Sequence, residues 1–380
     1  MTQTESRLGR GVLMIAHCAG MVDVVSLPVW INTLISAYHF DPQQSGLLAT
    51  LFLLGAVASS LFFAPRFNRV PARFAAPAGY LISTIAFALL SMTSNFGEMA
   101  ALHAIAGAAA GCGLSFTHGT IGRSRNPHRL FALAGFATGV FGVLFFATGP
   151  QIVHAFGGPG LFRLFSGLML AAALATSLAF PSPHHALASA TTRTPLSRSV
   201  WFAMLGVTGL ALVQAMTFAF AERVGIEHGF GEPAVQTVLV IVGFVSLVPA
   251  PLAALLETRI PALWVLIIAP IVQAALSITI TQSTVFLPYA ACFCVFAPVM
   301  IFSHTFAFGL LARLDPTGRA VAATPAMVMV GAALGPIVGG TLVKSVGYVA
   351  LGFAAAIVAL LVLSCFTRLY KNPTLLETAP

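Results

Sequence analysis

Long apolar runs, each separated from the next by a short polar connector, dominate the pattern of this chain. Twelve such runs of roughly 20 residues can be placed, which is the length that an α-helix needs to cross a bilayer. The divisions fall at proline, glycine and charged clusters such as Asp41-Pro42. No run alternates between apolar and polar positions, as membrane-spanning strands do. The pattern therefore predicts twelve helices, near residues 11–36, 44–64, 74–94, 98–121, 130–154, 160–180, 200–222, 233–256, 261–281, 286–311, 321–343 and 347–368.

The composition agrees with helices that are exposed to lipid. Hydrophobic residues make up 58% of the chain and charged residues only 7%, and the mean hydropathy is +0.95. A soluble domain carries about 25% charged residues, so this composition excludes a soluble globular domain. We expect an all-α polytopic membrane protein.

The basic residues are concentrated in every second connector. If the amino terminus lies inside the cell, 15 of the 18 lysines and arginines fall in inner connectors and three in outer ones. By the positive-inside rule, both chain ends are then cytoplasmic. The charges are spread over many connectors without interleaved aromatic residues, so they do not indicate nucleic-acid binding. The excess of Arg over Lys, with abundant Ala, is typical of GC-rich bacterial coding, and we expect the bacterial inner membrane.

Two halves of similar organisation make up the chain. The segment 181–199 is the most polar inner connector, and it is interpreted as a linker between six-helix bundles over 1–180 and 200–380. The tetrapeptide Arg69–Ala72 recurs with one conservative change as Arg259–Ala262, at an offset of half the chain. This correspondence predicts a duplicated unit, and therefore two pseudo-symmetric six-helix bundles.

One carboxylate lies deep inside an apolar run. Asp23 is about 13 residues into the first run, which places it near the middle of the membrane by helical rise. An ionised group at that depth costs roughly 3 kcal/mol unless it faces protein or water. Gly20, Ser26 and Trp30 share its helical face. We interpret Asp23 as a proton-coupling carboxylate or a counter-charge for a cationic cargo. The alternative is a structural group that hydrogen-bonds the first helix to a neighbour.

Four histidines fall within apolar runs, and two of them correspond by position. His118 in the fourth run and His304 in the tenth lie at matching levels of the two halves, and Ser115 shares the face of His118. Histidine exchanges protons near neutral pH, so this pair is a second predicted site of proton coupling. The alternative for each ring is a neutral core residue. His17 and His103 lie nearer the ends of their runs and are weaker candidates.

Polar or aromatic side chains inside the runs are candidates for contact with a cargo. Asn32, Trp30 and Ser115 belong to the first half, and Gln214 and Thr217 lie one turn apart in the seventh run. They suit hydrogen bonds or stacking that would orient a small molecule. The alternative is that the polar ones hydrogen-bond neighbouring helices.

Other polar residues carry no predicted site. Glu222 and Arg223 end the seventh run, where we expect a solvated ion pair. The five cysteines lie within predicted helices and lack the spacing of a redox or zinc site. The linker pair His184-His185 has no second ligand pair nearby. Neither a metal site nor a cofactor is therefore expected.

The motifs and their order resemble the major facilitator superfamily over essentially the whole chain. The connector after the second run is similar to that family's G-x-L-x-D-R-x-G-R-R signature, with Arg66 and Arg69 in place and Pro65 at the Asp position. The fourth run is similar to its R-x-x-x-G-x-G-x-G pattern, with His103 at the Arg position. The glycine motifs that add to the resemblance are Gly107, Gly111, Gly113, Gly142, Gly149-Pro150, Gly160 with Arg163, Gly331, Gly335-Pro336, Gly339 and Gly340.

The resemblance implies roles for several of these residues. Arg66, Arg69 and His103 are expected to be gating or structural residues. Gly149-Pro150 in the fifth run and Gly335-Pro336 in the eleventh are expected to act in the same way. A Gly-Pro pair allows close packing, removes a backbone hydrogen bond and bends a helix.

The resemblance also implies a secondary transporter that exposes a central site to each side of the membrane in turn. No G-x-x-x-x-G-K-[ST] motif is present, so the expected energy source is an ion gradient, with protons as the coupling ion. No Lys or Arg lies deep inside a run, which favours proton-coupled export of a small amphipathic or cationic molecule. The alternative is proton-linked transport of a small weak acid or neutral solute, and a non-transporting membrane sensor is a remote one. We expect a monomer in the lipid bilayer with a small-molecule substrate, and no enzyme activity.

Overall fold

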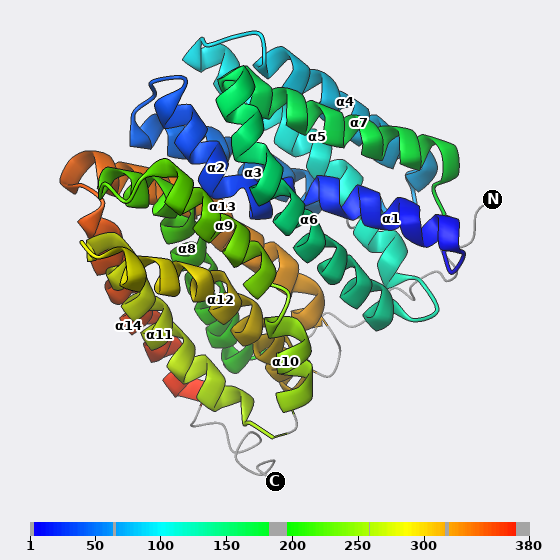
Figure 1. Ribbon diagram of the computed structural model, residues 1–380. Helices are drawn as coiled ribbons and strands as arrows, with labels where there is room; N and C mark the ends of the chain where they lie inside the picture. Colours follow the sequence, from blue (N-terminus) through cyan, green and yellow to red (C-terminus); the bar gives the residue numbers. More distant parts are fainter. Residues whose placement is uncertain (1–3, 64–65, 182–195, 258, 316–318, 370–380) are drawn as a thin grey trace. The chain divides into compact units, whose positions relative to one another are not determined.

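The structure, a computed structural model, describes residues 4–63, 66–181, 196–257, 259–315 and 319–369. This part of the chain is built of α-helices with short connectors and contains no β-strand (Figure 1). The helices are α1 (Arg7–Gly20), α2 (Val22–Ser36), α3 (Pro42–Phe63), α4 (Ala72–Leu90), α5 (Phe96–Gly122), α6 (Pro127–Phe156), α7 (Gly158–Ala179), α8 (Arg198–Glu227), α9 (Glu232–Val245), α10 (Pro249–Leu256), α11 (Ala262–Gln282), α12 (Phe286–Leu314), α13 (Arg319–Val346) and α14 (Val349–Leu369). Residues 182–195 of the predicted linker lie outside the described residues.

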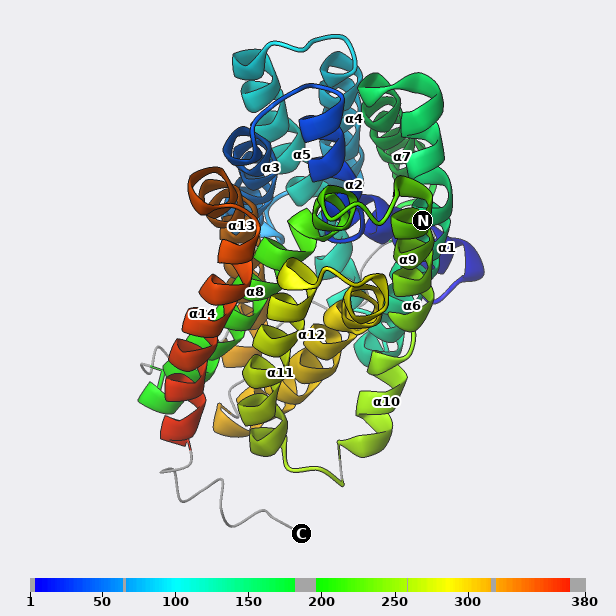
Figure 2. The same cartoon turned by 60° about the vertical axis from the view of Figure 1, so that its left-hand side comes forward.

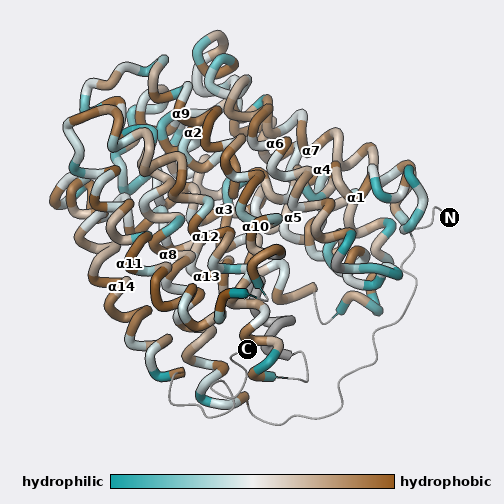
Figure 3. The backbone as a smooth tube through the Cα atoms, turned by 60° about the horizontal axis from the view of Figure 1, so that its bottom comes forward, coloured by the Kyte–Doolittle hydropathy of each residue, from teal (hydrophilic) through white to brown (hydrophobic). Residues whose placement is uncertain are grey.

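Twelve spans of helix are long and apolar enough to cross a membrane, which confirms the twelve predicted runs. Apolar positions extend along these helices (Figure 3). Two spans are each made of two helices: the first of α1 and α2, and the eighth of α9 and α10. The sequence predicted neither of these breaks.

The first break falls at Met21, whose backbone (φ −106°, ψ 20°) leaves the helical range and ends α1. Gly20, just before it, approaches Leu114 of α5 so closely that a Cβ atom would lie 2.8 Å from Leu114 Cδ1. Pro28 then removes one hydrogen bond inside α2. The first span is therefore two half-helices, and the second of them carries Asp23 in its first turn.

The second break lies between Val245, the end of α9, and Pro249, the start of α10. Pro249 occupies the first turn of α10, where its missing N–H group costs nothing. Val248, the residue before this proline, keeps helical dihedrals (φ −82°, ψ −40°), and α9 has already ended at Val245. The eighth span is thus interrupted near its end.

Contacts divide the chain into two units. Unit 1 comprises Met1–Phe40 and Leu47–Thr191, and unit 2 comprises Asp41–Gly46 and Thr192–Pro380. The helix α3 therefore contributes its first turn to unit 2 and its remaining length to unit 1.

Close helix packing characterises unit 1. The helix α4 lies between α5 and α7, and the three are side by side (Figure 1). Small residues permit this approach: a Cβ atom at Gly79 of α4 would lie 2.6 Å from the Ala109 carbonyl oxygen of α5. Between the helices, Phe52, Phe87 and Phe165 are fully buried and form part of an aromatic core.

Unit 2 is organised around α8 and α11. The helix α13 lies along α8, and α11 packs against α12 and α14 (Figure 2). Glycines again set the distance, since a Cβ atom at Gly335 of α13 would lie 2.7 Å from the Met216 nitrogen of α8. The apolar core of this unit includes Leu266 and Phe366, which are fully buried.

Candidate functional site

The break in the first span presents Asp23 in the first turn of α2. The backbone N–H groups of Asp23 and Val24 face its carboxylate, at the helix end where the dipole favours negative charge. The residue is half-buried, and α2 packs against α6 and α7 of unit 1. An acidic group held at the start of a half-helix inside a span can bind a proton or a cation.

Two histidines of unit 1 share a hydrogen bond between α1 and α5. His17 Nδ1 lies 2.9 Å from His118 Nε2, and the ring planes are tilted by 38°. His118 also meets the ring of Phe131 on α6 edge-on. His17 is 7% exposed, whereas His118 is only half-buried. The sequence did not predict this pair, because His118 was matched with a residue of the other half.

A tyrosine ties the same two helices together beside the histidine pair. The Tyr80 hydroxyl of α4 donates a hydrogen bond to the Ala16 carbonyl oxygen at 2.8 Å and lies 3.3 Å from Thr117 Oγ1. Ala16 precedes His17, and Thr117 precedes His118. The buried Tyr80 side chain therefore fixes the backbones from which both imidazoles project.

His304 and Ser115 lie in different units. His304 belongs to α12 of unit 2, where its ring is edge-on to Phe308 at a centroid distance of 4.1 Å. Its Nε2 atom has no hydrogen-bond partner among the described residues. Ser115 lies one turn from His118 on a partly accessible face of α5 in unit 1. The coupling role of His118 and His304 and the cargo role of Ser115 stay predictions.

Trp30 and His103 belong to the aromatic core of unit 1. Trp30 is 0% exposed, and its ring stacks on His103 with centroids 5.4 Å apart and planes 28° apart. Phe52 and Phe165 contact the same indole edge-on. His103 Nδ1 faces the Met99 carbonyl oxygen at 2.6 Å. The structure thus surrounds Trp30, predicted to contact cargo, with packed side chains, and His103 serves that packing.

The polar residues of α8 bond to α11 within unit 2. Thr217 Oγ1 lies 2.8 Å from Ser277 Oγ, and both residues are fully buried. The Gln273 amide donates to Gln214 Oε1 at 3.3 Å, and Gln214 keeps some accessible surface. Asn32, in α2 of unit 1, is half-buried. Thr217 therefore holds two helices together, while Gln214 and Asn32 retain surface that a small molecule could reach.

Glu222 is buried, which corrects the predicted solvated pair. Its exposed fraction is 2%, and α8 continues beyond it to Glu227. Arg223 instead pairs with Glu227 one turn further on. Next to Glu222, the Tyr289 hydroxyl of α12 donates to the Ala221 carbonyl oxygen at 2.8 Å.

The connector after α3 is held by a residue that sequence reasoning counted only as a positive charge. Arg66 and Arg69 are exposed, and Arg66 donates to a carbonyl of the end of α3. Arg123, at the end of α5, donates to Asn68 Oδ1 at 2.8 Å and lies 3.9 Å above the Phe67 ring. In the sequence, the role of Arg123 was indicated by its position just after the fourth apolar run and within a polar connector. Arg123 thus fixes the connector in which Arg66 and Arg69 lie.

The two Gly-Pro pairs lie in closely packed helices. In α6 of unit 1, Gly149 and Pro150 are buried, and a Cβ atom at Gly149 would lie 3.1 Å from the Phe145 ring. In α13 of unit 2, Gly335 faces α8, and the Pro336 carbonyl fills the space in which Gly46 of α3 would place a side chain. A larger residue at Gly335 would push α13 away from α8, whereas the atoms next to Gly149 belong to a ring of its own helix; the gating role of both pairs stays a prediction.

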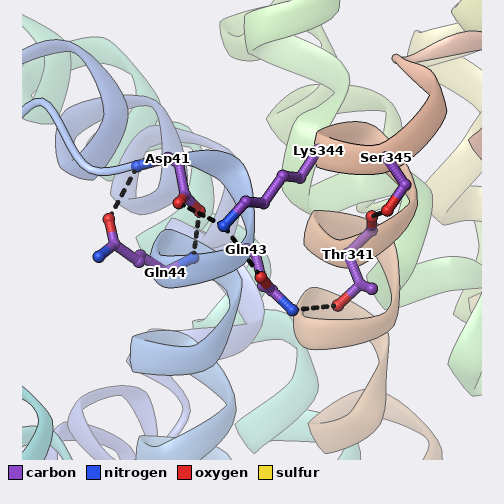
Figure 4. Close-up of polar contacts among 6 residues, drawn as sticks. All are labelled: Asp41, Gln43, Gln44, Thr341, Lys344 and Ser345. Carbon is purple, nitrogen blue, oxygen red and sulfur yellow. Dashed lines mark hydrogen bonds and ion pairs between the residues drawn. The ribbon is translucent and has the colours of Figure 1, made fainter.

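A polar cluster joins the first turn of α3 to the end of α13 in unit 2 (Figure 4). Lys344 Nζ donates to Asp41 Oδ2 at 2.9 Å and to Gln43 Oε1 at 3.2 Å. The Gln43 amide donates to Thr341 Oγ1 at 3.3 Å. Asp41 also caps α3, because its carboxylate accepts from the Gln44 N–H while the Gln44 side chain accepts from the Asp41 N–H.

These contacts favour the ionised form of Asp41. Partial burial opposes it, but the Gln44 backbone N–H and the Lys344 ammonium together outweigh that effect and lower the pKa of Asp41 below its ordinary value. The carboxylate is therefore charged throughout the neutral range. The first turn of α3 is held both by its cap and by Lys344.

No metal site is formed by the part of the chain that the structure describes. Within it, no three His, Cys, Asp or Glu side chains gather closely enough to hold an ion. The cysteines carry free thiols, and none is paired. The chemistry that the described residues offer is proton exchange and hydrogen bonding.

Comparisons with known proteins agree with this architecture. The family profile described as Major Facilitator Superfamily matches residues 12–324. A crystal structure of a variant of the nucleoside transporter NupG superposes with a TM-score of 0.73 at 13% identity, covering 96% of this chain and 99% of that one. A bacterial homologue of the human lysosomal transporter Spinster, solved inward-facing and unoccupied, gives 0.72 at 14% identity, covering 98% of both chains. At these identities the structural likeness shows the fold alone.

No curated protein matched the sequence. The family assignment therefore depends on the profile, which spans most of the chain, and on the twelve apolar spans with which it agrees. The chain is a multi-pass membrane protein and belongs to the major facilitator superfamily of transporters.

Proposed function

We propose that the protein is a proton-coupled secondary transporter that works by alternating access and exports a small amphipathic or cationic molecule. The observation that carries the proposal is the position of Asp23, in the first turn of a half-helix inside the first span. An ionisable group inside a membrane span costs free energy, so its presence there indicates a functional role. Neither a nucleotide-binding motif nor a metal cluster among the described residues offers another energy source.

A single carboxylate suits exchange of a proton for a cation. Asp23 can be neutralised by a proton or paired with a cationic cargo, and each would displace the other. If the carrier reorients only when the Asp23 charge is neutralised, the proton and the cationic cargo move across the membrane in opposite directions. Asn32 lies nine residues further along the same half-helix and on its opposite side, so its predicted contact with cargo is separate from that of Asp23.

The proposed setting follows from the charge distribution. If the amino terminus is cytoplasmic, 15 basic residues lie in inner connectors against three in outer ones, which supports cytoplasmic positions for both termini. The Arg-rich, Ala-rich composition supports a bacterial inner membrane. We propose a monomer.

A second candidate function is proton-linked transport of a small weak acid or neutral solute. Gln214 supports it, because this amide is partly accessible and its hydrogen bond from Gln273 is long, at 3.3 Å. One structural relative is named as a nucleoside transporter, so nucleosides are suitable neutral probes.

The test begins by finding a cargo. Purified protein is screened by thermal shift against organic cations, weak acids, nucleosides and sugars at two pH values, since a ligand of the native state raises the melting temperature. Proteoliposomes with a pH-sensitive dye inside then report proton movement driven by a gradient of the stabilising compound. Stabilisation by weak acids or nucleosides alone would favour the second candidate.

The decisive variant is Asp23→Asn. We expect it to abolish cargo-driven proton movement, because an amide cannot carry the exchanged proton. The matched control is Glu232→Gln, which also removes an acid from the first turn of a helix but at an exposed position. Cargo binding and proton movement that survive in Asp23→Asn would refute the proposal, and binding without any movement in the unmodified protein would indicate a sensor.

A further inference from the structure

The histidine pair of unit 1 has a property that neither ring would have alone. His17 Nδ1 and His118 Nε2 are 2.9 Å apart, which is a hydrogen-bond distance, so one of these two nitrogens carries the hydrogen and the other accepts it. Two neutral imidazoles hold two N–H hydrogens between them. One hydrogen then lies in the shared bond and the other on the outer nitrogen of the accepting ring.

This arrangement has room for one additional proton. The additional proton binds to the lone pair on the outer nitrogen of the donating ring. That ring becomes an imidazolium, which still donates its inner N–H to the neutral partner. The shared bond is retained and becomes charge-assisted, so it strengthens. A second additional proton would place hydrogens on both facing nitrogens and two positive charges at one contact. The pair therefore accommodates one extra proton and rejects two.

The surroundings leave each ring as the main electrostatic partner of the other. Among the described residues, no carboxylate, lysine or arginine acts on either imidazole. The neighbouring titratable groups are Cys18, which follows His17 on α1, and the buried Tyr80 of α4, which bonds to backbone and to Thr117. From α6 the contact is the apolar ring of Phe131. The second imidazole, rather than an acid, is thus the group available to share an extra proton.

The pair is fixed in place, and one of its rings is only partly buried. Tyr80 bonds to Ala16 and lies against Thr117, the residues that precede the two histidines, so the rings are anchored on adjacent backbones. Gly20 packed on Leu114 holds α1 to α5 one turn away. His118 keeps accessible surface, so the contact between α1 and α5 does not cover its ring completely.

We propose that His17 and His118 form a proton-carrying dyad, which takes up one proton between them and holds it across the contact of α1 and α5. The dyad is a second proton site beside Asp23, and it deepens the proton coupling on which the proposed function rests. Uptake forms one N–H bond at an outer ring nitrogen, and release breaks the same bond, so no other reactant is involved.

The test counts protons on the protein without any cargo or gradient. Purified protein in lipid nanodiscs is titrated from about pH 8 to about pH 4, a range that brackets the ordinary pKa of imidazole. The same titration is run on the His17→Gln/His118→Gln double variant, in which paired amides can keep a hydrogen bond. We expect the unmodified protein to take up one proton more than the double variant. A difference of none or of two would overturn the dyad.

Two further measurements make the result specific. The variant Tyr80→Phe removes the neighbouring anchor but leaves both imidazoles, so its difference from the double variant is expected to remain one proton. Nitrogen-15 NMR of histidine-labelled unmodified protein is expected to show one coupled N–H···N pair that persists after a single protonation. This measurement also serves if the double variant fails to fold, and two uncoupled imidazoliums would refute the dyad.

The outcomes separate this inference from the proposed function. Proton counting uses no cargo, so a protein that transports nothing could still show a one-proton dyad. Conversely, Asp23-dependent transport with no dyad proton would leave the proposed function intact and remove the dyad.

Discussion

The imidazole nitrogens of His17 and His118 lie 2.9 Å apart, and the ammonium of Lys344 lies at the same distance from the Asp41 carboxylate. His17 is only 7% exposed and His118 is half-buried, whereas the Lys344 and Asp41 side chains are 49% and 34% exposed. Water competes for an exposed ion pair, which contributes about 0–1 kcal/mol. A buried polar group that loses its partner costs about 1–3 kcal/mol. The exposure of each pair to water, rather than the distance between its atoms, decides which interaction contributes more to stability.

The two regions also differ in what supports them. The histidine pair is one hydrogen bond beside a tyrosine anchor. The first turn of α3 is packed against α13 backbone to backbone: side chains at Gly46 and Gly340 would overlap the carbonyls of Pro336 and Pro42. We therefore expect close packing, and not the ion pair, to hold the start of α3.

The largest expected effect comes from adding a side chain at the close contact between the start of α3 and α13. The variant Gly340→Leu places a side chain where the Pro42 carbonyl lies, and the obstructing atoms are backbone that has little freedom to move. We expect a loss of about 3 kcal/mol, at the upper end for overpacking, measured as a lower apparent melting temperature in detergent. The control is Gly167→Leu in α7, which meets nothing within 4 Å and has the same gain in helix propensity. Equal melting temperatures for the two variants would contradict the importance of the packing.

The next largest effect is expected at the histidine pair. The variant His118→Phe keeps an aromatic ring beside Phe131 but leaves His17 Nδ1 without its partner. We expect a destabilisation of about 1–2 kcal/mol, since the remaining polar atom is buried. A His17→Leu/His118→Phe double variant should cost less than the sum of the two single changes, because the first change already removes the bond. Strict additivity in thermal unfolding would show that the rings do not act together.

The apolar runs and the connectors between them predicted the fold because lipid leaves few alternatives. A span must be about 20 apolar residues long and must satisfy its backbone internally, so twelve helices followed from the sequence alone. The break at Met21 did not follow, since methionine is an ordinary helix residue and the cause lies partly in the packing of Gly20 on Leu114.

Fewer features of the candidate site than of the fold could be predicted from the sequence. Asp23 could be found, because one acid in an apolar run is conspicuous. The partner of His118 could not, because His17 is 101 residues away and the pairing depends on which faces of α1 and α5 meet. Glu222 was misplaced because the apolar run ends there while the helix does not.

A smaller effect is expected at the exposed ion pair. The variant Lys344→Met removes the contacts to Asp41 and Gln43 and retains the aliphatic stem. We expect a destabilisation below about 1 kcal/mol at low salt, and none at about 1 M salt, where the screening length is about 3 Å. The comparison is a pair of melting curves at each salt concentration. A loss as large as that of His118→Phe would show that this pair is not weakened by water.

The smallest effect is expected from the titration of Asp41, and its sign is fixed by the lowered pKa. A carboxyl group with a lower pKa in the folded state stabilises the protein above its unfolded value of about 3.9, and this contribution disappears as the pH falls through the folded value. The variant Asp41→Asn keeps an N-cap of similar quality but loses the charge that faces Lys344. Its melting temperature should lie below that of the unmodified protein by the equivalent of a few tenths of a kcal/mol at pH 7. The difference should persist down to about pH 4 and shrink only as the pH falls further, through the lower folded value; a difference that grows on acidification would mean that Asp41 is not held in its ionised form.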